Sequence, residues 1–311
     1  MAAPKVLVIR GGAIGDFILT LPAIRMLRET LPLVQLELLG YKGILDLALR
    51  AGLADTTRHL EHGSMAKLFV PGAVLDEALI DYFRSFNMVI SYLYDPDGYF
   101  RGNMERIGVK TFLEASHRVE PGKGHAAEQL ARPLEKLAMF LEDPAARLTF
   151  EPPLVLPVSR PVVAIHPGSG SLKKNWPVER WISTGHEIAR SHPGFQLALV
   201  TGEAELERGI TAAVVEGWRD LDYLHWDQLA LTDLAVRLAA SAAFLGHDSG
   251  IGHLAAAVGL PCLLLFGPTD PAVWAPRNPG VKVLLEESGD LAFLTETEMW
   301  AHLAPLFEQV K

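Results

Sequence analysis

The sequence has only one cysteine among its 311 residues. This single thiol, Cys262, excludes an internal disulfide and a zinc site built from several cysteines. It lies in the apolar run PCLLLF, which predicts a buried structural side chain. No close spacing of histidines and acids indicates another kind of metal site, so we expect no bound metal ion.

The chain also lacks an excess of positive charge. Its formal net charge of −9 at pH 7 argues against a nucleic-acid partner, although a local basic pocket for a phosphate stays compatible with it. No apolar run approaches the roughly 20 residues that span a bilayer, because LAAAVGLPCLLLF is interrupted by Gly259 and Pro261. The first residues, MAAPKVLVIR, lead directly into a predicted strand. We therefore expect a cytoplasmic protein, and contact with the cytoplasmic face of the inner membrane stays open.

Short, almost entirely apolar runs alternate with segments of helical period along the chain. The runs predicted as strands are 5–10, 35–40, 88–93, 109–114, 161–166, 195–200, 221–226, 242–247, 261–266 and 281–286. The predicted helices between them include 15–31, 125–141, 178–192, 231–241 and 250–258. Strands that are apolar on both faces predict an α/β fold with parallel sheets covered by helices.

A proline-rich stretch separates two halves that begin in the same way. The stretch TFEPPLVLPVSRPV, residues 149–162, has four prolines and no helical period. Residues 5–31 and 161–192 each predict a strand, a glycine-rich turn and a helix. We therefore expect two Rossmann-like, doubly wound parallel-sheet domains that face each other across a cleft, followed by a helix that packs back on them. The expected bounds are 1–155, 156–294 and 295–311.

The first turn, RGGAIGDF, combines Gly11, Gly12 and Gly15 with one acid, Asp16. The glycines do not have the G-x-G-x-x-G spacing of dinucleotide-binding turns, but they allow a ligand close to the backbone at a helix start. A carboxylate there would repel a phosphate. Asp16 could simply cap the helix, or it could act as a general base at the edge of a cleft, and its position alone leaves both roles open.

A second turn, HPGSGSLKKNWP at residues 166–177, is rich in glycine, serine and lysine. Its backbone N–H groups, the Ser169 hydroxyl and either Lys173 or Lys174 could hold a diphosphate. The order G-K-[ST] of a Walker A loop is absent. The alternative is a surface loop with two solvated lysines.

A third turn, FLGHDSGIGHLAAAVGLP at residues 244–261, places Asp248, Ser249 and Gly250 between a strand and a helix that carries His253. Carboxylates accept hydrogen bonds from sugar hydroxyls, and N–H groups at a helix start bind phosphate. The alternatives are an N-cap role for Asp248 and a core position for His253.

Two weaker signals lie on other loops. Thr269 and Asp270 in FGPTDPAVWAP are polar, but ordinary turn chemistry explains most of that pattern. Asp95 and Asp97 in YDPDGYF could contact a substrate or could only shape the turn.

The chain resembles glycosyltransferase family 9, the ADP-heptose:lipopolysaccharide heptosyltransferase group, in three segments: RGGAIGDFILTLPAIRMLRE, IHPGSGSLKKNWPVERW and DSGIGHLAAAVGLPCLLLFGPTDPAVWAP. The resemblance spans nearly the whole chain and implies the GT-B architecture of two Rossmann-like domains. It also implies an inverting, metal-independent enzyme without a cofactor. Such an enzyme moves heptose from ADP-heptose to a hydroxyl of a glycan or glycolipid acceptor, in lipopolysaccharide core or related glycoconjugate synthesis.

The same resemblance assigns roles by position. Asp16 matches the catalytic base, and the glycines at 11, 12 and 15 give room to the acceptor. The residues assigned to the donor are Ser169, Lys174, Glu205, Asp248, Ser249, Gly250 and His253. Within this set, Lys174 matches the contact to the phosphates and Asp248 the contact to the sugar, while Glu205, chosen over Glu203, is assigned to the adenosine.

Two other functions are compatible with this architecture. A sugar-nucleotide epimerase would use the same nucleotide site, but it needs a second acid/base pair that the sequence does not reveal. A nucleotide-sugar-binding protein without catalysis needs no base, and the presence of Asp16 argues against it.

Overall fold

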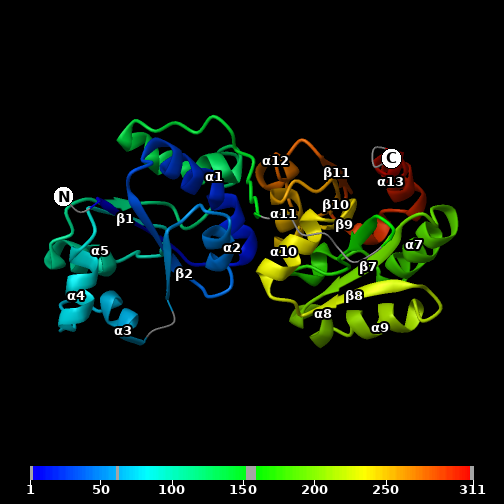
Figure 1. Cartoon of the computed structure of the whole chain (residues 1–311), viewed down its shortest axis with the longest axis horizontal. Coiled ribbons are helices and arrows are strands. Elements are labelled where there is room, and N and C mark those ends of the chain that lie inside the picture. The colour runs from blue at the N-terminus through cyan, green and yellow to red at the C-terminus, as the bar shows by residue number, and fades with distance from the viewer. Residues whose placement is uncertain (1–2, 61–62, 152–158, 309–311) are drawn as a thin grey trace. The chain divides into compact units, whose positions relative to one another are not determined.

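The computed structural model describes residues 3–60, 63–151 and 159–308 (Figure 1). The chain forms two units, Met1–Pro144 and Ala145–Lys311. The division precedes residue 155 because the segment after Pro144 is bonded to the second unit. The Leu148 N–H donates to the Ala257 carbonyl at 2.8 Å, and Asn278 Nδ2 donates to the Ala146 carbonyl at 2.8 Å. Most of the proline-rich stretch, 152–158, lies outside the described residues.

The first unit is built on a parallel sheet of five strands in the order β3-β2-β1-β4-β5. The strands are β1 (Lys5–Arg10), β2 (Gln35–Gly40), β3 (Thr56–His59), β4 (Met88–Ser91) and β5 (Phe112–Glu114). The central strand β1 is almost completely buried, with Ile9 opposite Leu39 of β2 and Ser91 of β4. Burial on both faces accounts for its uninterrupted apolar sequence.

Helices cover both faces of this sheet. They are α1 (Ile14–Thr30), α2 (Leu45–Arg50), α3 (Gly63–Ala66), α4 (Glu77–Arg84), α5 (Tyr99–Ile107) and α6 (Ala126–Ala131), with 3₁₀ turns η1 (Lys67–Phe69) and η2 (Arg132–Leu137). On one face, Phe83 of α4 and Met104 of α5 pack with Leu7 and Ile9 of β1. On the other, α1 packs against α6.

Two elements of the first unit differ from the sequence expectation. Strand β3 was not predicted, because its sequence TTRH is polar and half-exposed at the edge of the sheet. The helix predicted over 125–141 is wrong beyond Ala131. Pro133 cannot continue an α-helix, so the chain tightens into η2 and ends at Ala138, whose φ is +57°.

The second unit has a parallel sheet of six strands in the order β11-β10-β9-β6-β7-β8. The strands are β6 (Val162–Ile165), β7 (Gln196–Thr201), β8 (Tyr223–Asp227), β9 (Ala243–His247), β10 (Cys262–Phe266) and β11 (Val281–Leu285). Strands β7 and β8 are added on one side of β6, and β9 to β11 on the other, so the strand order reverses between β6 and β9. Doubly wound sheets bind ligands at such a switch point. All ten predicted strands correspond to strands of the structure.

The helices of the second unit are α7 (Val178–Ser191), α8 (Glu203–Glu207), α9 (Ile210–Gly217), α10 (Leu231–Ala239), α11 (Gly250–Ala257), α12 (Pro271–Trp274) and α13 (Glu296–Glu308), with 3₁₀ turns η3 (Leu172–Lys174) and η4 (Leu291–Phe293). One core joins Trp181 of α7 and Trp218, directly after α9, to Leu303 of α13 and to the sheet. Cys262 is fully buried in β10, as expected.

The α/β class and the two doubly wound parallel sheets are therefore confirmed, whereas the cleft between the domains stays a prediction. Within the described ranges, no helix combines the length and apolar character that crossing a membrane requires.

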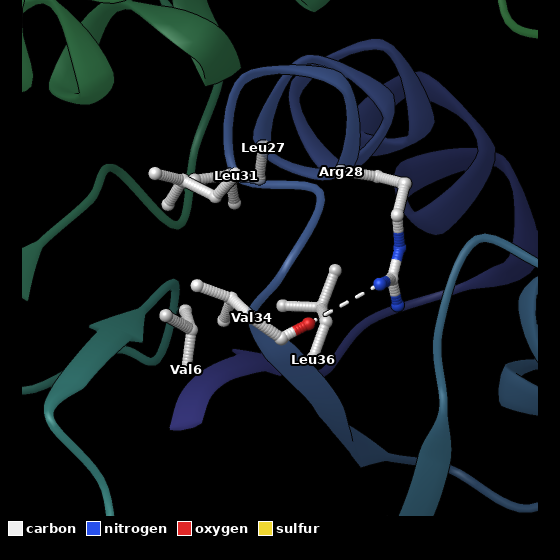
Figure 2. Close-up of a pocket in the computed structure, with 6 residues that line it drawn as sticks. All are labelled: Val6, Leu27, Arg28, Leu31, Val34 and Leu36. Carbon is white, nitrogen blue, oxygen red and sulfur yellow. Dashed lines mark hydrogen bonds between the residues drawn. The ribbon is translucent and has the colours of Figure 1, made fainter. Parts of the chain in front are cut away.

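Figure 2 shows a narrow gap in the first unit, where the end of α1 packs on β1 and β2. Its lining residues are Val6, Leu27, Arg28, Leu31, Val34 and Leu36. The gap is too narrow for a water molecule. Arg28 closes one side by donating Nη1 to the Val34 carbonyl at 3.3 Å and Nη2 to the Asp55 carboxylate at 2.6 Å. This gap is a packing feature and offers no ligand site.

Candidate functional site

The turn between β1 and α1 holds Asp16 against the start of its own helix. Asp16 Oδ2 accepts a hydrogen bond from the Ala13 N–H at 3.1 Å and so caps α1. Gly12 has φ +101°, and a Cβ there would lie 2.9 Å from Asp16 Oδ2, so this position requires glycine. The Asp16 side chain is still 41% exposed. The capping role is thus present, and it leaves carboxylate lone pairs open to solvent.

A buried arginine lies beside Asp16. Arg10, the last residue of β1, donates Nε to the Thr20 hydroxyl at 3.1 Å and Nη2 to the Asp16 carbonyl at 3.3 Å. Its guanidinium lies 3.8 Å from Asp16 Oδ1 and 5.5 Å from the centre of the Tyr92 ring. Burial lowers the pKa of Arg10, while Asp16 counteracts that shift. The turn therefore has an exposed carboxylate, Asp16, beside the buried guanidinium of Arg10.

Asp248 is the centre of a cluster in the second unit. Its Oδ2 lies 2.6 Å from Lys174 Nζ and accepts a hydrogen bond from the Thr269 hydroxyl at 2.7 Å. Its Oδ1 lies 3.7 Å from His253 Nε2. We call these four residues the Asp248 cluster. They come from η3, from the β9–α11 turn and α11, and from the loop after β10, so the fold joins three separate segments here.

The Asp248 cluster holds a buried negative charge. Asp248 is 7% exposed. Burial by itself would raise the pKa of this carboxyl, but His253 and Lys174 hold it well below its usual range. Asp248 is not the N-cap of α11, because Ser249 has that role and accepts the Gly252 N–H at 3.1 Å. The Asp248 carboxylate thus has no capping role, and it interacts with Lys174, Thr269 and His253.

Loop 166–177, between β6 and α7, carries Lys174 toward Asp248. Ser169 is buried, and its hydroxyl lies 2.8 Å from the Ser171 carbonyl and 2.6 Å from Asn175 Oδ1. Arg208, directly after α8, donates Nη1 to the Ser169 carbonyl at 2.6 Å. Lys173, the alternative considered above, is exposed. The structure therefore places Lys174, and not Lys173, in the cluster.

Glu205 borders the same loop from α8. Its Oε2 accepts the Gly202 N–H at 2.9 Å and lies 3.6 Å from His166 Nε2. Burial would raise the pKa of Glu205, but His166 keeps it below its usual range. A Cβ on Gly168 would lie 1.9 Å from Glu205 Oε1, so only glycine allows this approach. Glu203, the residue not chosen, is exposed.

The structure thus brings most of the predicted donor residues to one edge of the second sheet. Lys174, Asp248 and His253 meet directly, and Ser249 and Gly250 form the start of α11 beside them. Asp16 and its three glycines belong to the other unit. In the part of the chain that the structure describes, no group of three or more His, Cys, Asp or Glu side chains could hold a metal ion.

Sequence reasoning missed several residues of this edge. Thr269 was explained as turn chemistry, yet its hydroxyl bonds Asp248 across 21 positions of sequence. Arg208 and His247, which bond carbonyls of loop 166–177, were not singled out. A lone arginine or histidine gives no local pattern, and the only available signal for His247 is its place at the end of the apolar strand before Asp248.

A larger cavity, of about 400 Å³, lies on the second unit between α7 and α13. Its lining residues are Ser183, Thr184, His186, Glu187, Arg190, Glu296, Thr297, Met299 and Trp300. None of the predicted site residues lines it.

Comparison with known proteins agrees with this architecture. The sequence model of glycosyltransferase family 9 (heptosyltransferase) matches residues 119–302. Lipopolysaccharide heptosyltransferase 1 of Pseudomonas aeruginosa is 37% identical over 112 residues, which are 35% of this chain and 29% of that protein. The matched stretches span only 29–39% of the length of such curated relatives.

Two solved structures from E. coli are similar over nearly their full length. ADP-heptose lps heptosyltransferase II superposes with a TM-score of 0.76 at 19% identity, covering 98% of this chain and 99% of that one. Heptosyltransferase WaaC with ADP-2-deoxy-2-fluoro heptose has a TM-score of 0.71 at 17% identity, covering 97% and 99%. At such low identity the likeness shows the fold, and it confirms the two parallel-sheet domains of the GT-B architecture.

Proposed function

The chain belongs to glycosyltransferase family 9, and from this premise we propose that it transfers a sugar from a nucleoside diphosphate to an acceptor hydroxyl with inversion. Heptose from ADP-heptose is the proposed donor. This choice follows from the family and from the similar E. coli protein, whose structure contains an ADP-heptose analogue. A glycan or glycolipid, in lipopolysaccharide core or related synthesis, is the proposed acceptor.

The observation that carries the donor proposal is the Asp248 cluster. A leaving diphosphate needs positive charge and N–H donors, which Lys174 and the start of α11 would supply. Asp248, buried and ionised, would accept hydrogen bonds from sugar hydroxyls. When the donor binds, Lys174 would divide its three N–H donors between Asp248 and a phosphate oxygen.

We assign Asp16 as the general base. Its carboxylate would take the proton of the acceptor hydroxyl while that oxygen forms a bond to the anomeric carbon. The bond between this carbon and the diphosphate oxygen would break, and the nucleoside diphosphate would leave with the electron pair. Asp16 is suited to this role because one oxygen caps α1 while the side chain stays 41% exposed.

A panel of ADP-, UDP- and GDP-sugars tests the donor class. We expect ADP-heptose to raise the melting temperature and to be slowly hydrolysed, as seen by mass spectrometry, with smaller effects of UDP- and GDP-sugars. Stabilisation by UDP-sugars alone would overturn the ADP assignment. Conversion of the donor to an epimer at constant mass, seen by NMR without an acceptor, would indicate an epimerase instead.

A further inference from the structure

His247 bonds both ends of the segment that contains Ser169 and Lys174. It is the last residue of β9 and is completely buried. Its Nε2 accepts a hydrogen bond from the Trp176 N–H at 2.8 Å, and its Nδ1 lies 3.1 Å from the Gly168 carbonyl. One imidazole therefore spans residues 168 and 176 of loop 166–177, and it does so from the strand that leads into Asp248.

The two contacts fix the protonation of the ring. Because Nε2 accepts from a backbone N–H, the single proton of the neutral ring lies on Nδ1 and is donated to the Gly168 carbonyl. A protonated ring could not accept the Trp176 N–H. Burial lowers the pKa of His247 to about 3; among its charged neighbours, His166 lowers this pKa, and Asp248 and Glu205 raise it.

Arg208 also forms hydrogen bonds to loop 166–177. Arg208 donates Nη1 to the Ser169 carbonyl at 2.6 Å and Nη2 to the Gly170 carbonyl at 3.3 Å. Three successive carbonyls, from 168 to 170, thus accept hydrogen bonds from His247 and Arg208. Among the described residues, no group accepts from the N–H of Ser169 or Gly170. These two N–H groups could donate to an anion, as backbone N–H groups do in other anion-binding loops.

We propose that His247 is a positioning residue that holds loop 166–177 in its donor-binding conformation and in register with Asp248. The proposal rests on the proposed function, since it takes the diphosphate of the donor as the anion. His247 does not touch the substrate. It acts by fixing Gly168 and Trp176 before the donor arrives, so that binding need not order the loop.

Three substitutions separate the two contacts. His247→Asn keeps a donor near the Nδ1 position, His247→Gln keeps an acceptor near the Nε2 position, and His247→Leu removes both. Each variant is compared with the wild type in ADP affinity by calorimetry and in hydrogen exchange of the peptide spanning 168–176.

We expect His247→Leu to raise the dissociation constant of ADP at least tenfold and to speed exchange across 168–176. Compared with the Leu variant, the Gln variant should slow hydrogen exchange near residue 176, because it keeps an acceptor for the Trp176 N–H. The Asn variant should slow exchange there to a smaller extent. Both should bind ADP more tightly than the Leu variant. Should the Leu variant fail to fold, the contrast between Asn and Gln still tests the proposal.

Leu238→Ala is the matched control. Leu238 is fully buried in α10, a few residues before β9 begins, and it lies outside the core cluster that contains Trp176 of loop 166–177. Its truncation therefore destabilises the same unit from the end of β9 opposite His247. Exchange across 168–176 and ADP affinity should stay close to the wild type in this control. An equal change in the control would show that the effect comes from lower stability and would overturn the proposal.

The proposal is also overturned if His247→Leu binds ADP within twofold of the wild type and leaves exchange of the loop unchanged. The exchange measurement needs no nucleotide. If wild-type protein bound no ADP, that result would count against the proposed function, and the exchange of 168–176 would still decide whether His247 holds the loop.

Discussion

Asp16 and Asp248 are acids in similar local settings of the two units, each where the carboxyl end of a strand leads into the first turn of a helix. Asp16 is 41% exposed and accepts one backbone hydrogen bond, with Arg10 at 3.8 Å. Asp248 is 7% exposed and faces Lys174, Thr269 and His253. A carboxylate that accepts one hydrogen bond has lone pairs left for a reacting hydroxyl, whereas a buried one with three side-chain partners is held in place. Similar local motifs thus acquire different surroundings through their tertiary partners, which is why we propose different roles for the two acids.

The two units also differ in charge. The first has 16 basic and 18 acidic residues, and the second has 12 basic and 19 acidic residues. The more acidic unit is the one that we propose binds a diphosphate. Its net charge repels such a ligand, so binding must depend on local features: Lys174, the start of α11, and the N–H groups of loop 166–177.

We expect the largest effect from replacing the exposed acid, Asp16. Asp16→Asn keeps an oxygen that can cap α1 but removes the base, so the rate of sugar transfer should fall by about 10²–10⁴-fold. The dissociation constant of ADP should stay within twofold, because Asp16 belongs to the other unit. Steady-state transfer assays and calorimetry measure these two quantities.

Glu128→Gln is the control for Asp16→Asn. Glu128 caps α6 in the same way, with Oε2 accepting the His125 N–H at 3.2 Å. A similar loss of transfer in both variants, or full activity of Asp16→Asn, would refute the role of Asp16 as base.

A second substitution removes the charge of the buried acid, Asp248. Asp248→Asn leaves Lys174 without its counter-charge, so the free energy of unfolding should fall by about 1–3 kcal/mol. ADP-heptose should bind about 10–100-fold more weakly. Urea unfolding and calorimetry measure the two effects. Asp270→Asn, at an exposed N-cap of α12, should change both little, and equal losses in the two variants would argue against a specific role of Asp248.

A third prediction compares substitutions of the two neighbouring lysines, Lys174→Ala and Lys173→Ala, in their effect on ADP affinity. Lys174 Nζ lies 2.6 Å from Asp248, and its removal should weaken ADP binding about tenfold, because one charged hydrogen bond to phosphate is lost. Lys173→Ala is the matched variant, since Lys173 is the exposed neighbour, and its effect should stay below twofold. Equal ADP affinity of the two variants, measured by calorimetry, would contradict the assignment.

The last prediction concerns pH dependence and compares a histidine from each unit. The pKa of His247 is lowered to about 3 by burial, from an ordinary value of 6.5. Between these values the unfolded chain takes up a proton that the folded chain does not, so stability falls as pH falls, by at most about 1.4 kcal/mol per pH unit. The free energy of unfolding of His247→Gln should fall less steeply with falling pH than that of the wild type, because glutamine does not titrate.

Urea unfolding at several values between pH 7.5 and 4.5 measures this slope. The pKa of His117 in the first unit is also lowered, by burial and by Arg118 and Arg10, but His117 is only partly buried. His117→Gln should therefore flatten the slope less than His247→Gln does. An unchanged slope in His247→Gln would show that another group titrates in this range. Asp248, whose pKa is lowered, adds its own loss of stability only as pH falls below about 4.

Local patterns in the sequence were sufficient for most of the fold. Apolar runs such as KVLVIR predicted the buried strands, because burial on both faces leaves little choice of residue. The same patterns located Asp16, loop 166–177 and the turn at Asp248. They failed for β3, a polar edge strand, and for the end of α6, where Pro133 forced a 3₁₀ turn.

Strands, turns and the residue types at each turn follow from local sequence, since they depend on neighbours a few positions apart. Contacts between distant segments follow from the arrangement of the strands in the sheet. Lys174 and Asp248 are 74 positions apart, and His247 lies 79 positions from Gly168. The order of strands in the sheet, with β6 beside β9, brings these segments together. Periodicity contains no information about such pairings, because they depend on which strand lies next to which.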